Sequence, residues 1–539
     1  MCPLEGQFFV LPDIYPIKPQ ISSSFPPFSI SFFGQDYKWG FQIGEDEQRH
    51  QWFKLDLDPS HRRDTSQLAR LFPDPKAAPP GYDMHPEKLS TDYFTAIRKH
   101  GEQILRCKLP SSALQSLPIE YIITVPAVWS DVAQAQTRLC AEQAGMGLGH
   151  ALHIISEPEA AAVYALDVLD PHIIDIGDTF VLCDAGGGTV DLISYTVTAL
   201  KPNLEINEAT PGTGSLCGSA FLNRRFEKFL EDKLGKEPAA KRFEAVIKKQ
   251  FRGIEGEEFK VPVHGLPDNT RLGLSRGKLT LNGDEVRKIF EPIVHEVNKL
   301  VMNQVRNTTQ AVKKPKAIVM VGGFGQSAYL RDCIRSVVAS SGIEVLQSPN
   351  GWTAVVRGAL MKGLATNSPT FASVEISGRC ARKHYGLRVQ EEFINGVHEE
   401  NRRYFDPFRG KDVIAIMNWF MKKAQIVQED TPIRLFYRSL CLEAYGHPSE
   451  IAVTISVCSD RENFGAPMYP DSEGVARLVD VKANLSPIPL ATFPKATGAD
   501  GRSYFRVDFD IEITCYSAYT KFELIHDGKN YGPVAAEYV

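Results

Sequence analysis

The sequence has no long uninterrupted apolar run, and this absence excludes the commonest kind of membrane protein. No stretch of the 539 residues approaches the roughly 18 uncharged apolar residues that a membrane-spanning helix needs. The chain begins MCPLEGQFFVLPDIYPIKPQ, which lacks the basic start, the long apolar core and the small-residue cleavage site of a secretory signal. We therefore expect no membrane partner and a cytoplasmic location, with the nucleus as the alternative compartment.

An excess of charge of one sign is also missing. The chain has 60 Lys and Arg against 65 Asp and Glu, a formal net charge of −5, which argues against nucleic acid as a partner. Its ten cysteines include no CxxC pair, a pattern typical of reduced, mostly structural thiols in the cytosol. With 43% apolar and 23% charged residues, the composition is that of an ordinary globular protein.

Three consecutive glycines stand between two aspartates in the stretch VLCDAGGGTVDLISYTV (181–197). Glycine has no Cβ, so the backbone there can adopt positive φ, and successive N–H groups in such a turn form a concavity for phosphate oxygens. The apolar, β-branched flanks predict a hairpin, which brings Asp184 and Asp191 within reach of one Mg²⁺ ion. The simpler interpretation is a tight hairpin with two solvated aspartates.

Composition and hydrophobic pattern divide the sequence into three predicted regions. Residues 1–26 are rich in proline and irregular, and residues 27–366 alternate strand-like with helix-like patterns, which indicates an α/β architecture. Residues 374–539 predict a separate β-rich module, because segments such as YFRVDFDIEITCY (504–516) alternate strictly and Asp527-Gly528 is a hairpin signal. In that segment, one face carries Phe505, Val507, Phe509, Ile511, Ile513 and Cys515.

Four motifs follow one another in the α/β region: TVPAVW (124–129), SEPEAAAVYAL (156–166), DAGGGTVDL (184–192) and VGGFGQSAYL (321–330). In this order they resemble the two-lobed, actin-like ATPase domain of the seventy-kilodalton heat-shock chaperone family. The GGF form of the last motif is typical of a divergent branch of that family. The resemblance implies an ATP-binding chaperone-like protein that uses ATP or ADP with Mg²⁺, with extended peptide clients and co-chaperones as partners, and it makes the β-rich module a substrate-binding sandwich.

The resemblance also implies a role for individual residues at the phosphate end of a nucleotide. Asp184 and Asp191 would hold the hydrated Mg²⁺, Glu157 would order the metal's water shell or the attacking water, and Lys54 would reach the γ-phosphate. Carboxylates, a metal and backbone donors suffice for this chemistry, because in phosphoryl transfer the protein mainly positions groups and neutralises charge. The β- and γ-phosphates would be cradled by Gly186, Gly187, Gly188 and Thr189.

At the adenosine end, the resemblance implies that two glycines let the backbone approach the nucleoside. These are Gly322 and Gly323, and the family pattern puts Phe324 and Gln326 beside the base or the ribose. The residues expected to border the nucleoside are Gly218 and either Lys248 or Lys249.

Several of these residues have a simpler interpretation. Lys54 has the features of an ordinary surface lysine whose stem lies on apolar surface, and Glu157 could serve only to stabilise the positive end of its helix. The Gly322-Gly323 pair could be a strand-to-helix turn without a ligand. Phe324 and Tyr329 could be core aromatics, and for Tyr329 we favour the core.

The same glycine turn supports a different class of protein. GFGQSA has the spacing of a dinucleotide fingerprint, and Glu344 follows about 20 residues later, as a ribose-binding acid would. A dinucleotide-dependent enzyme is therefore an alternative, although the fingerprint explains neither DAGGGTVD nor SEPEAAA.

One part of the family pattern is missing. The family begins with a strand, a glycine turn and a second strand that carries an aspartate, and nothing in residues 1–35 has this form. Without it, the site lacks a metal-side carboxylate and one of its two phosphate clamps. We therefore expect weak or impaired ATP hydrolysis, and the alternative is a non-catalytic interaction protein that keeps the fold and binds nucleotide.

Overall fold

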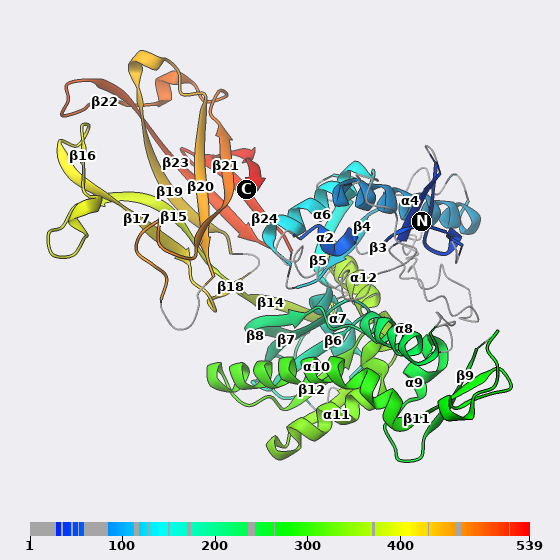
Figure 1. The fold of residues 1–539 in the computed structure, drawn as a ribbon. Coiled ribbons are helices and arrows are strands. Elements are labelled where there is room, and N and C mark those ends of the chain that lie inside the picture. The colour runs from blue at the N-terminus through cyan, green and yellow to red at the C-terminus, as the bar shows by residue number, and fades with distance from the viewer. Residues whose placement is uncertain are drawn as a thin grey trace. The chain divides into compact units, whose positions relative to one another are not determined.

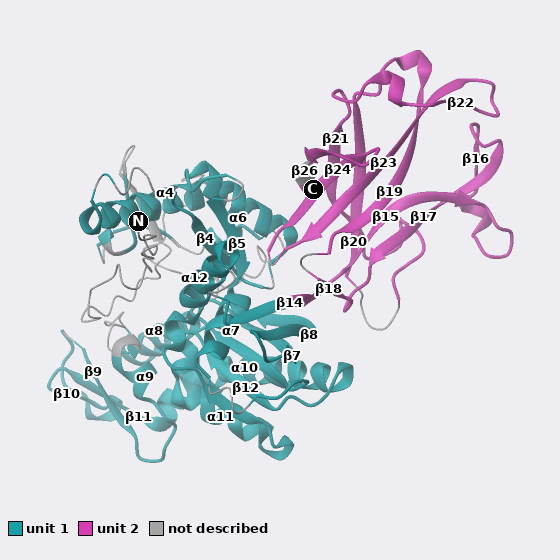
Figure 2. Cartoon of the chain, turned by 180° about the vertical axis from the view of Figure 1, so that it is seen from behind, with its two compact units in different colours: residues 1–376 teal, residues 377–539 magenta. Residues whose placement is uncertain are grey.

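The computed structural model divides into two compact units, residues 1–376 and residues 377–539 (Figure 2). No helix in the described ranges is both long enough and apolar enough to cross a membrane. The structure describes residues 29–33, 36–44, 47–51, 53–58, 85–110, 112, 118–127, 129–148, 151–169, 174–235, 243–263, 265–368, 372–428, 431–459, 465–516 and 518–538.

The first lobe of unit 1 contains two separate small sheets in its described part. One is antiparallel in the order β2-β1-β3, and the other is the parallel pair β4-β5. The expectation that residues 1–35 lack the first phosphate motif of the family pattern lies largely outside the described residues, which include only 29–33 of that segment. The helices and strands of this lobe are β1 (Ser29–Phe33), β2 (Asp36–Trp39), β3 (His50–Gln51), α2 (Phe53–Asp56), α4 (Pro86–Lys108), β4 (Tyr121–Val125), α6 (Asp131–Gln143) and β5 (Leu152–Ser156).

The second lobe is built around a mixed sheet in which β13-β12-β6-β7-β8 are neighbours and β14 follows β8 (Figure 1). β6 pairs with β12 in parallel and with β7 antiparallel, through the predicted glycine hairpin. The helices and strands are α7 (Glu157–Asp167), β6 (Thr179–Ala185), β7 (Val190–Ala199), β8 (Leu204–Ser215), α8 (Ala220–Leu234), α9 (Lys248–Gln250), β9 (Glu258–Pro262), β10 (Leu274–Ser275), β11 (Lys278–Asn282), α10 (Gly283–Ala311), β12 (Ala317–Val321), α11 (Ala328–Val338), β13 (Glu344–Gln347), α12 (Ala354–Asn367) and β14 (Val374–Cys380).

The alternation of side chains along β6 and β7 divides the core of this lobe in two. On one face, Val181, Cys183 and Leu192 pack with α8, α10 and α11. On the other face, Leu182 and Ile193 pack with α7. Successive residues of a strand point to opposite faces of the sheet, so a strand covered on both sides is apolar throughout, as VLC at 181–183 is.

Helices α7 and α12 cross at a contact made by small residues. A Cβ on Gly358 of α12 would lie 1.6 Å from the carbonyl oxygen of Ala160 in α7, so only glycine fits there. The alanine run of the EPEAAA segment is fully buried, which explains its composition. The same two helices also contact β4 and β5 through Ile122 and Ile155, so they join the two lobes of unit 1.

Unit 2 is a sandwich of two antiparallel sheets around one apolar core, with orders β16-β17-β15-β20-β21-β26 and β19-β23-β24-β25. The predicted face of 504–516 is confirmed, since its members from Phe505 to Ile513 are buried in this core and Cys515 packs against it. Asp527 and Gly528 have φ of 49° and 72°, as a hairpin turn requires. The strands are β15 (His384–Glu392), β16 (Tyr404–Asp406), β17 (Lys411–Met421), β18 (Ile426–Gln428), β19 (Ile433–Leu442), β20 (Glu450–Cys458), β21 (Val475–Asn484), β22 (Lys495–Thr497), β23 (Ser503–Cys515), β24 (Thr520–His526), β25 (Lys529–Pro533) and β26 (Ala535–Tyr538).

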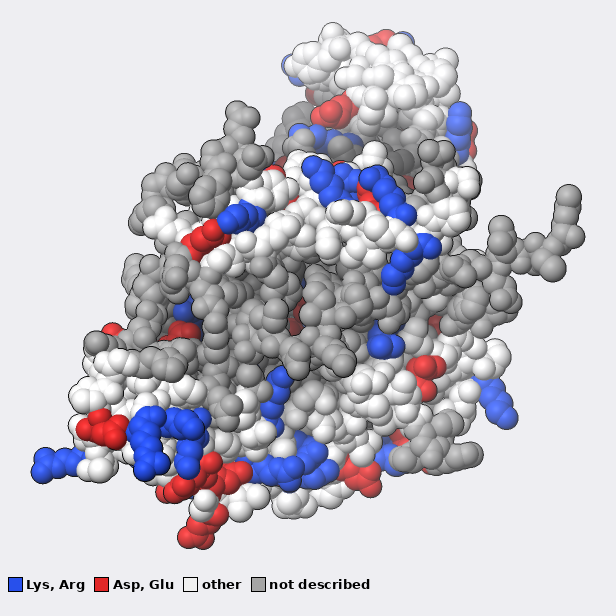
Figure 3. Space-filling model, turned by 90° about the vertical axis from the view of Figure 1, so that its right-hand side faces the viewer, with Lys and Arg blue, Asp and Glu red and all other residues white. Residues whose placement is uncertain are grey.

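The predicted fold class is therefore confirmed: a two-lobed, actin-like α/β unit followed by a β-rich unit. The surface of the face shown in Figure 3 carries Lys and Arg interspersed with Asp and Glu, and its described residues form no extended region of one sign.

Candidate functional site

The two aspartates of the glycine hairpin lie side by side on one face of the sheet. Asp184 in β6 and Asp191 in β7 are cross-strand partners, and both are buried, with 6% and 2% of their surface exposed. Each has the same strand parity as Leu182 and Ile193, which pack towards α7. The hairpin therefore directs both carboxylates to the face where Glu157 begins α7.

The glycine turn is bonded to the first residue of α8 and the two residues that precede this helix. Three successive N–H groups, those of Gly218, Ser219 and Ala220, donate to the carbonyls of Gly188, Gly186 and Gly187 at 2.8–3.1 Å. A Cβ on Gly218 would lie 2.3 Å from the Gly187 carbonyl oxygen, so this glycine is needed for the contact. The Gly186 N–H closes the turn on the Thr189 carbonyl. Because the turn's carbonyls face α8, we infer that the amides of Gly187 and Gly188 face the opposite side, as a phosphate cradle requires.

The backbone conformation of this turn differs from the expected one. Neither Gly186 nor Gly187 has a positive φ, so the left-handed conformation is not what requires glycine there. Nothing lies within 4 Å of a Cβ built on Gly187, which leaves open space above the turn. Neither φ nor contact with α8 requires glycine at position 187, where the absence of a side chain keeps the space above the turn open.

The second glycine motif meets the first at a single point. Gly322 follows β12, has a φ of 82°, and a Cβ on it would lie 2.5 Å from a carboxylate oxygen of Asp184. Its N–H donates to the carbonyl of Gly351 at 2.9 Å. Gly323 is exposed and has nothing within 4 Å of a Cβ position. The structure therefore brings the two motifs together, with open space beside both.

Glu157 and Lys54 form an ion pair at the start of α7. The Lys54 ammonium lies 2.6 Å from a Glu157 carboxylate oxygen, with 22% and 18% of the two side chains exposed. The helix is capped by Ser156, whose hydroxyl accepts from the Glu159 N–H, and the proline after Glu157 occupies the first turn as predicted. Lys54 is thus held inside unit 1 and does not extend into solvent as a surface lysine would.

The sequence reasoning missed two residues near Lys54, one that contacts its ammonium and one that ties its segment to Ser130. Trp129, which ends the TVPAVW motif and is 4% exposed, has its ring centroid 5.6 Å from the Lys54 ammonium, within the range of a cation–π contact. Asp58, which is fully buried, accepts from both the N–H and the hydroxyl of Ser130 at 2.8 and 3.0 Å. The sequence signal for Asp58 is present in WFKLDLD, where a charged residue follows an apolar helix, but only the fold supplies its partner.

The electrostatics of the site favour a cation. Burial raises the pKa of Asp184 well above its usual range, and the neighbouring carboxylates of Glu157 and Asp191 raise it further, while Lys54 opposes them. Three carboxylates with one lysine leave a net negative charge that a divalent cation would neutralise. No group of three or more His, Cys, Asp or Glu side chains in metal-binding geometry occurs in the described ranges. Mg²⁺ bound with a nucleotide does not need one, because it usually takes one or two carboxylates, phosphate oxygens and water.

The remaining predicted residues lie around the two turns. The Lys248 ammonium is held by Ser219 and Asn223 at the start of α8, 3.2–3.3 Å away, whereas Lys249 is exposed. The Thr189 carbonyl accepts from the Gly186 N–H and closes the first turn. Gln326 is exposed beside the second turn.

The second motif contains two aromatic residues, one buried in the core and one partly buried against it. Phe324 is 2% exposed and belongs to the core cluster of α8, α10 and α11. Its ring is therefore a core aromatic and does not lie beside the base or ribose. Tyr329 packs against the same cluster and lies 4.7 Å from the ring of Phe251, which confirms the favoured core assignment.

The geometry of Glu344 does not suit a dinucleotide site. Glu344 begins β13 and pairs with Ala317 at the start of β12, whereas the glycine turn follows Val321 at the end of β12. At about 3.3 Å per residue, the acid and the turn are separated by roughly 13 Å along the strands. A ribose-binding acid in such folds lies at the carboxyl ends of the strands. The position of Glu344 therefore does not support a dinucleotide-dependent enzyme.

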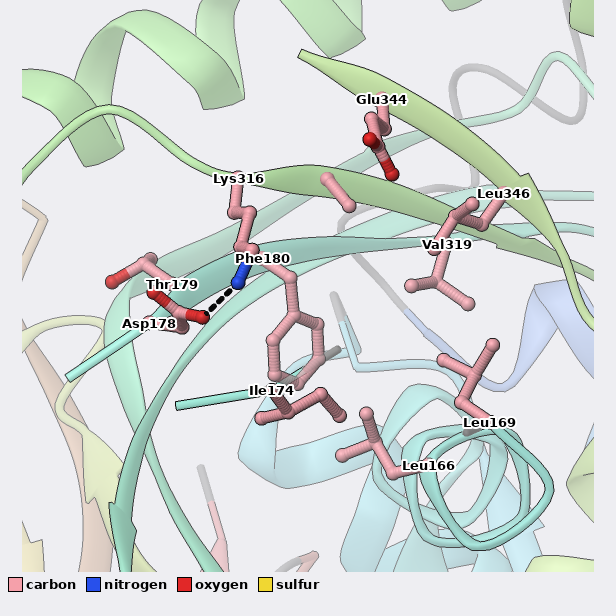
Figure 4. Close-up of a pocket in the computed structure, with 11 residues that line it drawn as sticks. Leu166, Leu169, Ile174, Asp178, Thr179, Phe180, Lys316, Val319, Glu344 and Leu346 are labelled. Atoms are coloured by element: carbon pink, nitrogen blue, oxygen red, sulfur yellow. Dashed lines mark hydrogen bonds and ion pairs between the residues drawn. The ribbon is translucent and has the colours of Figure 1, made fainter. Parts of the chain in front are cut away.

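Glu344 lies instead at the rim of an apolar pocket, shown in Figure 4, at the beginnings of β6 and β12. Lys316 and Asp178 pair at its edge at 2.6 Å, and Leu166, Phe180 and Val319 form part of its wall. Because Asp184 lies at the other end of β6, this pocket is not part of the carboxylate site.

Comparison with known proteins supports this geometry. The family model described as Hsp70 protein matches residues 76–376, more than half of the chain. The relatives include a chaperone protein HscA homolog of Methylobacillus flagellatus, 28% identical over 244 residues, which are 44% of this chain and 35% of that protein. They also include human heat shock 70 kDa proteins 12B and 12A, 22% and 23% identical, with 56% and 53% of this chain and 55% and 54% of those proteins covered. The chain thus belongs to the Hsp70 family, as a divergent member that spans about a third to a half of the length of these relatives.

Proposed function

We propose that this chain is an ATP-binding, chaperone-like protein that binds an adenine nucleotide with Mg²⁺ between the two glycine turns and hydrolyses ATP weakly. The contact between Gly322 and the Asp184 carboxylate carries this proposal. It sets an exposed glycine turn directly beside a buried pair of carboxylates, and phosphate, metal and nucleoside need such a juxtaposition. Membership of the Hsp70 family supports the adenine nucleotide over other phosphate compounds.

Each part of the site has a task that its chemistry supports. The amides of Gly187–Thr189 would hold the phosphate oxygens, since the Gly186 N–H is engaged by the Thr189 carbonyl. Asp184 and Asp191 would hold the hydrated Mg²⁺ directly or through water. The Mg²⁺ ion, when bound, neutralises charge on the phosphates. Glu157, fixed at the start of α7, would orient a water molecule, and Lys54 would place its positive charge near the terminal phosphate.

One observation favours a second function, that of a nucleotide-binding interaction protein without turnover. Lys54 and Glu157, which we assign to the terminal phosphate and to a water molecule, are already engaged with each other at 2.6 Å. If this pair persists when nucleotide is bound, Lys54 neutralises Glu157 rather than the terminal phosphate, and the missing first clamp is not replaced. Binding would then survive without hydrolysis.

The two functions are separated by Lys54→Met. If Lys54 contacts the terminal phosphate, the variant loses affinity for ATP but not for AMP, because AMP lacks that phosphate. If the Lys54–Glu157 pair is only structural, both affinities stay unchanged. Lys88→Met serves as the matched control, since Lys88 forms a comparable pair with Asp92 on the exposed side of α4.

For unit 2 we propose binding of extended peptides. The support is its two-sheet sandwich and its position after the nucleotide unit in an Hsp70-family chain. Fluorescence anisotropy with labelled unfolded peptides, with and without ATP, tests this. Peptide binding that is absent under both conditions would leave the nucleotide proposal intact but remove the chaperone part.

The nucleotide proposal is tested by calorimetric titration and thermal unfolding of the full chain with ATP, ADP and NAD, each with and without Mg²⁺. A ligand that binds only the native state raises the unfolding temperature. We expect stabilisation by ATP and ADP that grows with Mg²⁺, and none by NAD. Stabilisation by NAD alone would overturn the proposal in favour of a dinucleotide-dependent protein.

A further inference from the structure

Trp352 is a large exposed aromatic residue beside the candidate site. Of the tryptophans in the described ranges, Trp39 and Trp419 are partly buried, Trp129 is 4% exposed, and Trp352 is 68% exposed. A tryptophan side chain has about 150–250 Å² of surface to bury, so folding normally gains from covering it. An indole left in solvent next to a ligand site has the properties of a contact surface for that ligand.

The backbone on either side of Trp352 is firmly attached to the second glycine turn. The Gly351 carbonyl accepts from the Gly322 N–H at 2.9 Å, and a Cβ on Gly351 would lie 2.6 Å from the Gln326 amide nitrogen. Asn350 has a φ of 50°, a left-handed conformation that asparagine tolerates, and this reverses the chain before Gly351.

On the other side of Trp352, Thr353 is 3% exposed and its hydroxyl accepts from the Arg357 guanidinium at 3.0 Å. Trp352 therefore stands between two buried, anchored residues, and its own side chain is left outside.

Gly322 links this segment to the phosphate end of the site. It touches the Asp184 carboxylate on one side and bonds to Gly351 on the other. Gly323, the next residue of this turn, is exposed, so the path from Asp184 to Trp352 along the turn is open to a nucleotide whose phosphates lie at Asp184. The ring of Phe324 cannot meet the base there because it is buried in the core. Trp352 is the aromatic residue in the adjoining segment that is exposed enough to do so.

We propose that Trp352 stacks on the base of the bound nucleotide and that the site thereby selects base-bearing nucleotides over inorganic polyphosphate. This inference rests on the proposed nucleotide site and adds the feature of the ligand that the site recognises. Stacking between a base and an aromatic side chain contributes an amount that corresponds to about a 5- to 100-fold change in affinity.

The test is calorimetric titration of the full chain with Mg-ATP and with Mg-tripolyphosphate, for the natural sequence, Trp352→Ala and Trp352→Phe. We expect Trp352→Ala to bind ATP about 5- to 100-fold more weakly. Its affinity for tripolyphosphate should stay unchanged, and Trp352→Phe should retain most of the ATP affinity. Tyr445→Ala is the control, because Tyr445 is 85% exposed and lies in unit 2.

The outcomes separate the two proposals. Unchanged ATP affinity in Trp352→Ala, or an equal loss for ATP and tripolyphosphate, would overturn the stacking role and leave the nucleotide site standing. A natural-sequence chain that binds tripolyphosphate and ATP equally well would also overturn it. Absence of ATP binding to the natural sequence would refute the nucleotide site itself, and the role of Trp352 with it.

Discussion

Gly322 and Asp184, which come from different motifs of the sequence, are in direct contact at the carboxyl ends of two neighbouring parallel strands. A Cβ on Gly322 would lie 2.5 Å from the Asp184 carboxylate and 2.3 Å from the carbonyl oxygen of Ala185. The backbone cannot retreat easily, because Gly322 is also bonded to Gly351. Any side chain at position 322 must therefore displace the acid that we assign to the metal.

The first prediction compares two glycines with similar backbone conformations. Gly322 and Gly342 have φ of 82° and 64°, so alanine strains both, at a cost of about 1 kcal/mol or more. A Cβ at position 322 would collide with the Asp184 carboxylate, whereas nothing lies within 4 Å of a Cβ on Gly342. We expect both variants to lose some stability but only Gly322→Ala to lose Mg-ATP affinity, by at least about tenfold. Equal affinities in calorimetry would contradict the contact's role.

The second prediction concerns the stability of the chain without ligand. Burial and two neighbouring carboxylates raise the pKa of Asp184, so its ionisation at neutral pH opposes folding, and this penalty vanishes below the pKa of the unfolded chain. Asp184→Asn removes the charge at nearly constant shape. We expect the unfolding temperature without metal to rise by about 1–3 °C, although Mg-ATP binding is lost.

Asp178, at the other end of β6, is the matched control for this substitution. Burial acts to raise its pKa, but hydrogen bonds from Lys316 and from the Asp175 N–H outweigh that effect, and the net shift is downward. Its ionised form therefore supports folding above the unfolded pKa, and Asp178→Asn should leave the unfolding temperature unchanged or lower. A fall in unfolding temperature for Asp184→Asn, as large as or larger than for Asp178→Asn, would argue against a charge-crowded site.

The third prediction tests the scaffold beneath the site. Gln304 of α10 is fully buried and joins three hydroxyls of the sheet, donating to Ser194 and Thr210 and accepting from Thr213 at 2.9–3.1 Å. Gln304→Leu leaves these hydroxyls without that partner, which costs about 1–3 kcal/mol. Gln310→Leu, an exposed position on the same helix, should have little effect. Chemical denaturation of both variants measures the difference, and equal stabilities would mean that this network contributes nothing.

The fourth prediction is that hydrolysis is weak even where binding is strong. Binding needs the two glycine turns, whereas turnover needs charge neutralised on both sides of the transferring phosphate. Loss of one preorganised transition-state contact typically lowers the rate by about 10²–10³. Single-turnover hydrolysis with excess chain over ATP measures this rate, and the Asp184→Asn variant serves as the control for background hydrolysis. Rapid hydrolysis that Asp184→Asn abolishes would mean that another segment supplies the missing clamp.

The sequence predicted the fold from local patterns, and the family resemblance assigned the two glycine motifs to one nucleotide. Period-two alternation marks the strands, and a chain with glycine after each of two parallel neighbours must bring those turns together. The core position of Tyr329 was predicted on the same grounds and is confirmed.

Local sequence patterns could not predict the contacts between distant segments of the chain. The roles of Asp58 and Trp129 depend on partners that come from other elements of the first lobe. The sequence allows two reasons for glycine at positions 186 and 187, a positive φ and room for another group. Neither residue has a positive φ, and open space lies above Gly187. A lone sequence cannot distinguish these two reasons for glycine.

The central claim is that a nucleotide lies against the Gly186–Thr189 turn, and a single methyl group tests it most directly. A Cβ on Gly187 meets nothing within 4 Å and its φ is not in the left-handed region, so Gly187→Ala should fold with an unchanged unfolding temperature. Gly465→Ala, at another open loop glycine, is the control. In calorimetric titration with Mg-ATP, the account predicts that Gly187→Ala binds at least about tenfold more weakly than the natural sequence and Gly465→Ala binds equally well. Mg-ATP binding of undiminished affinity to Gly187→Ala would contradict it.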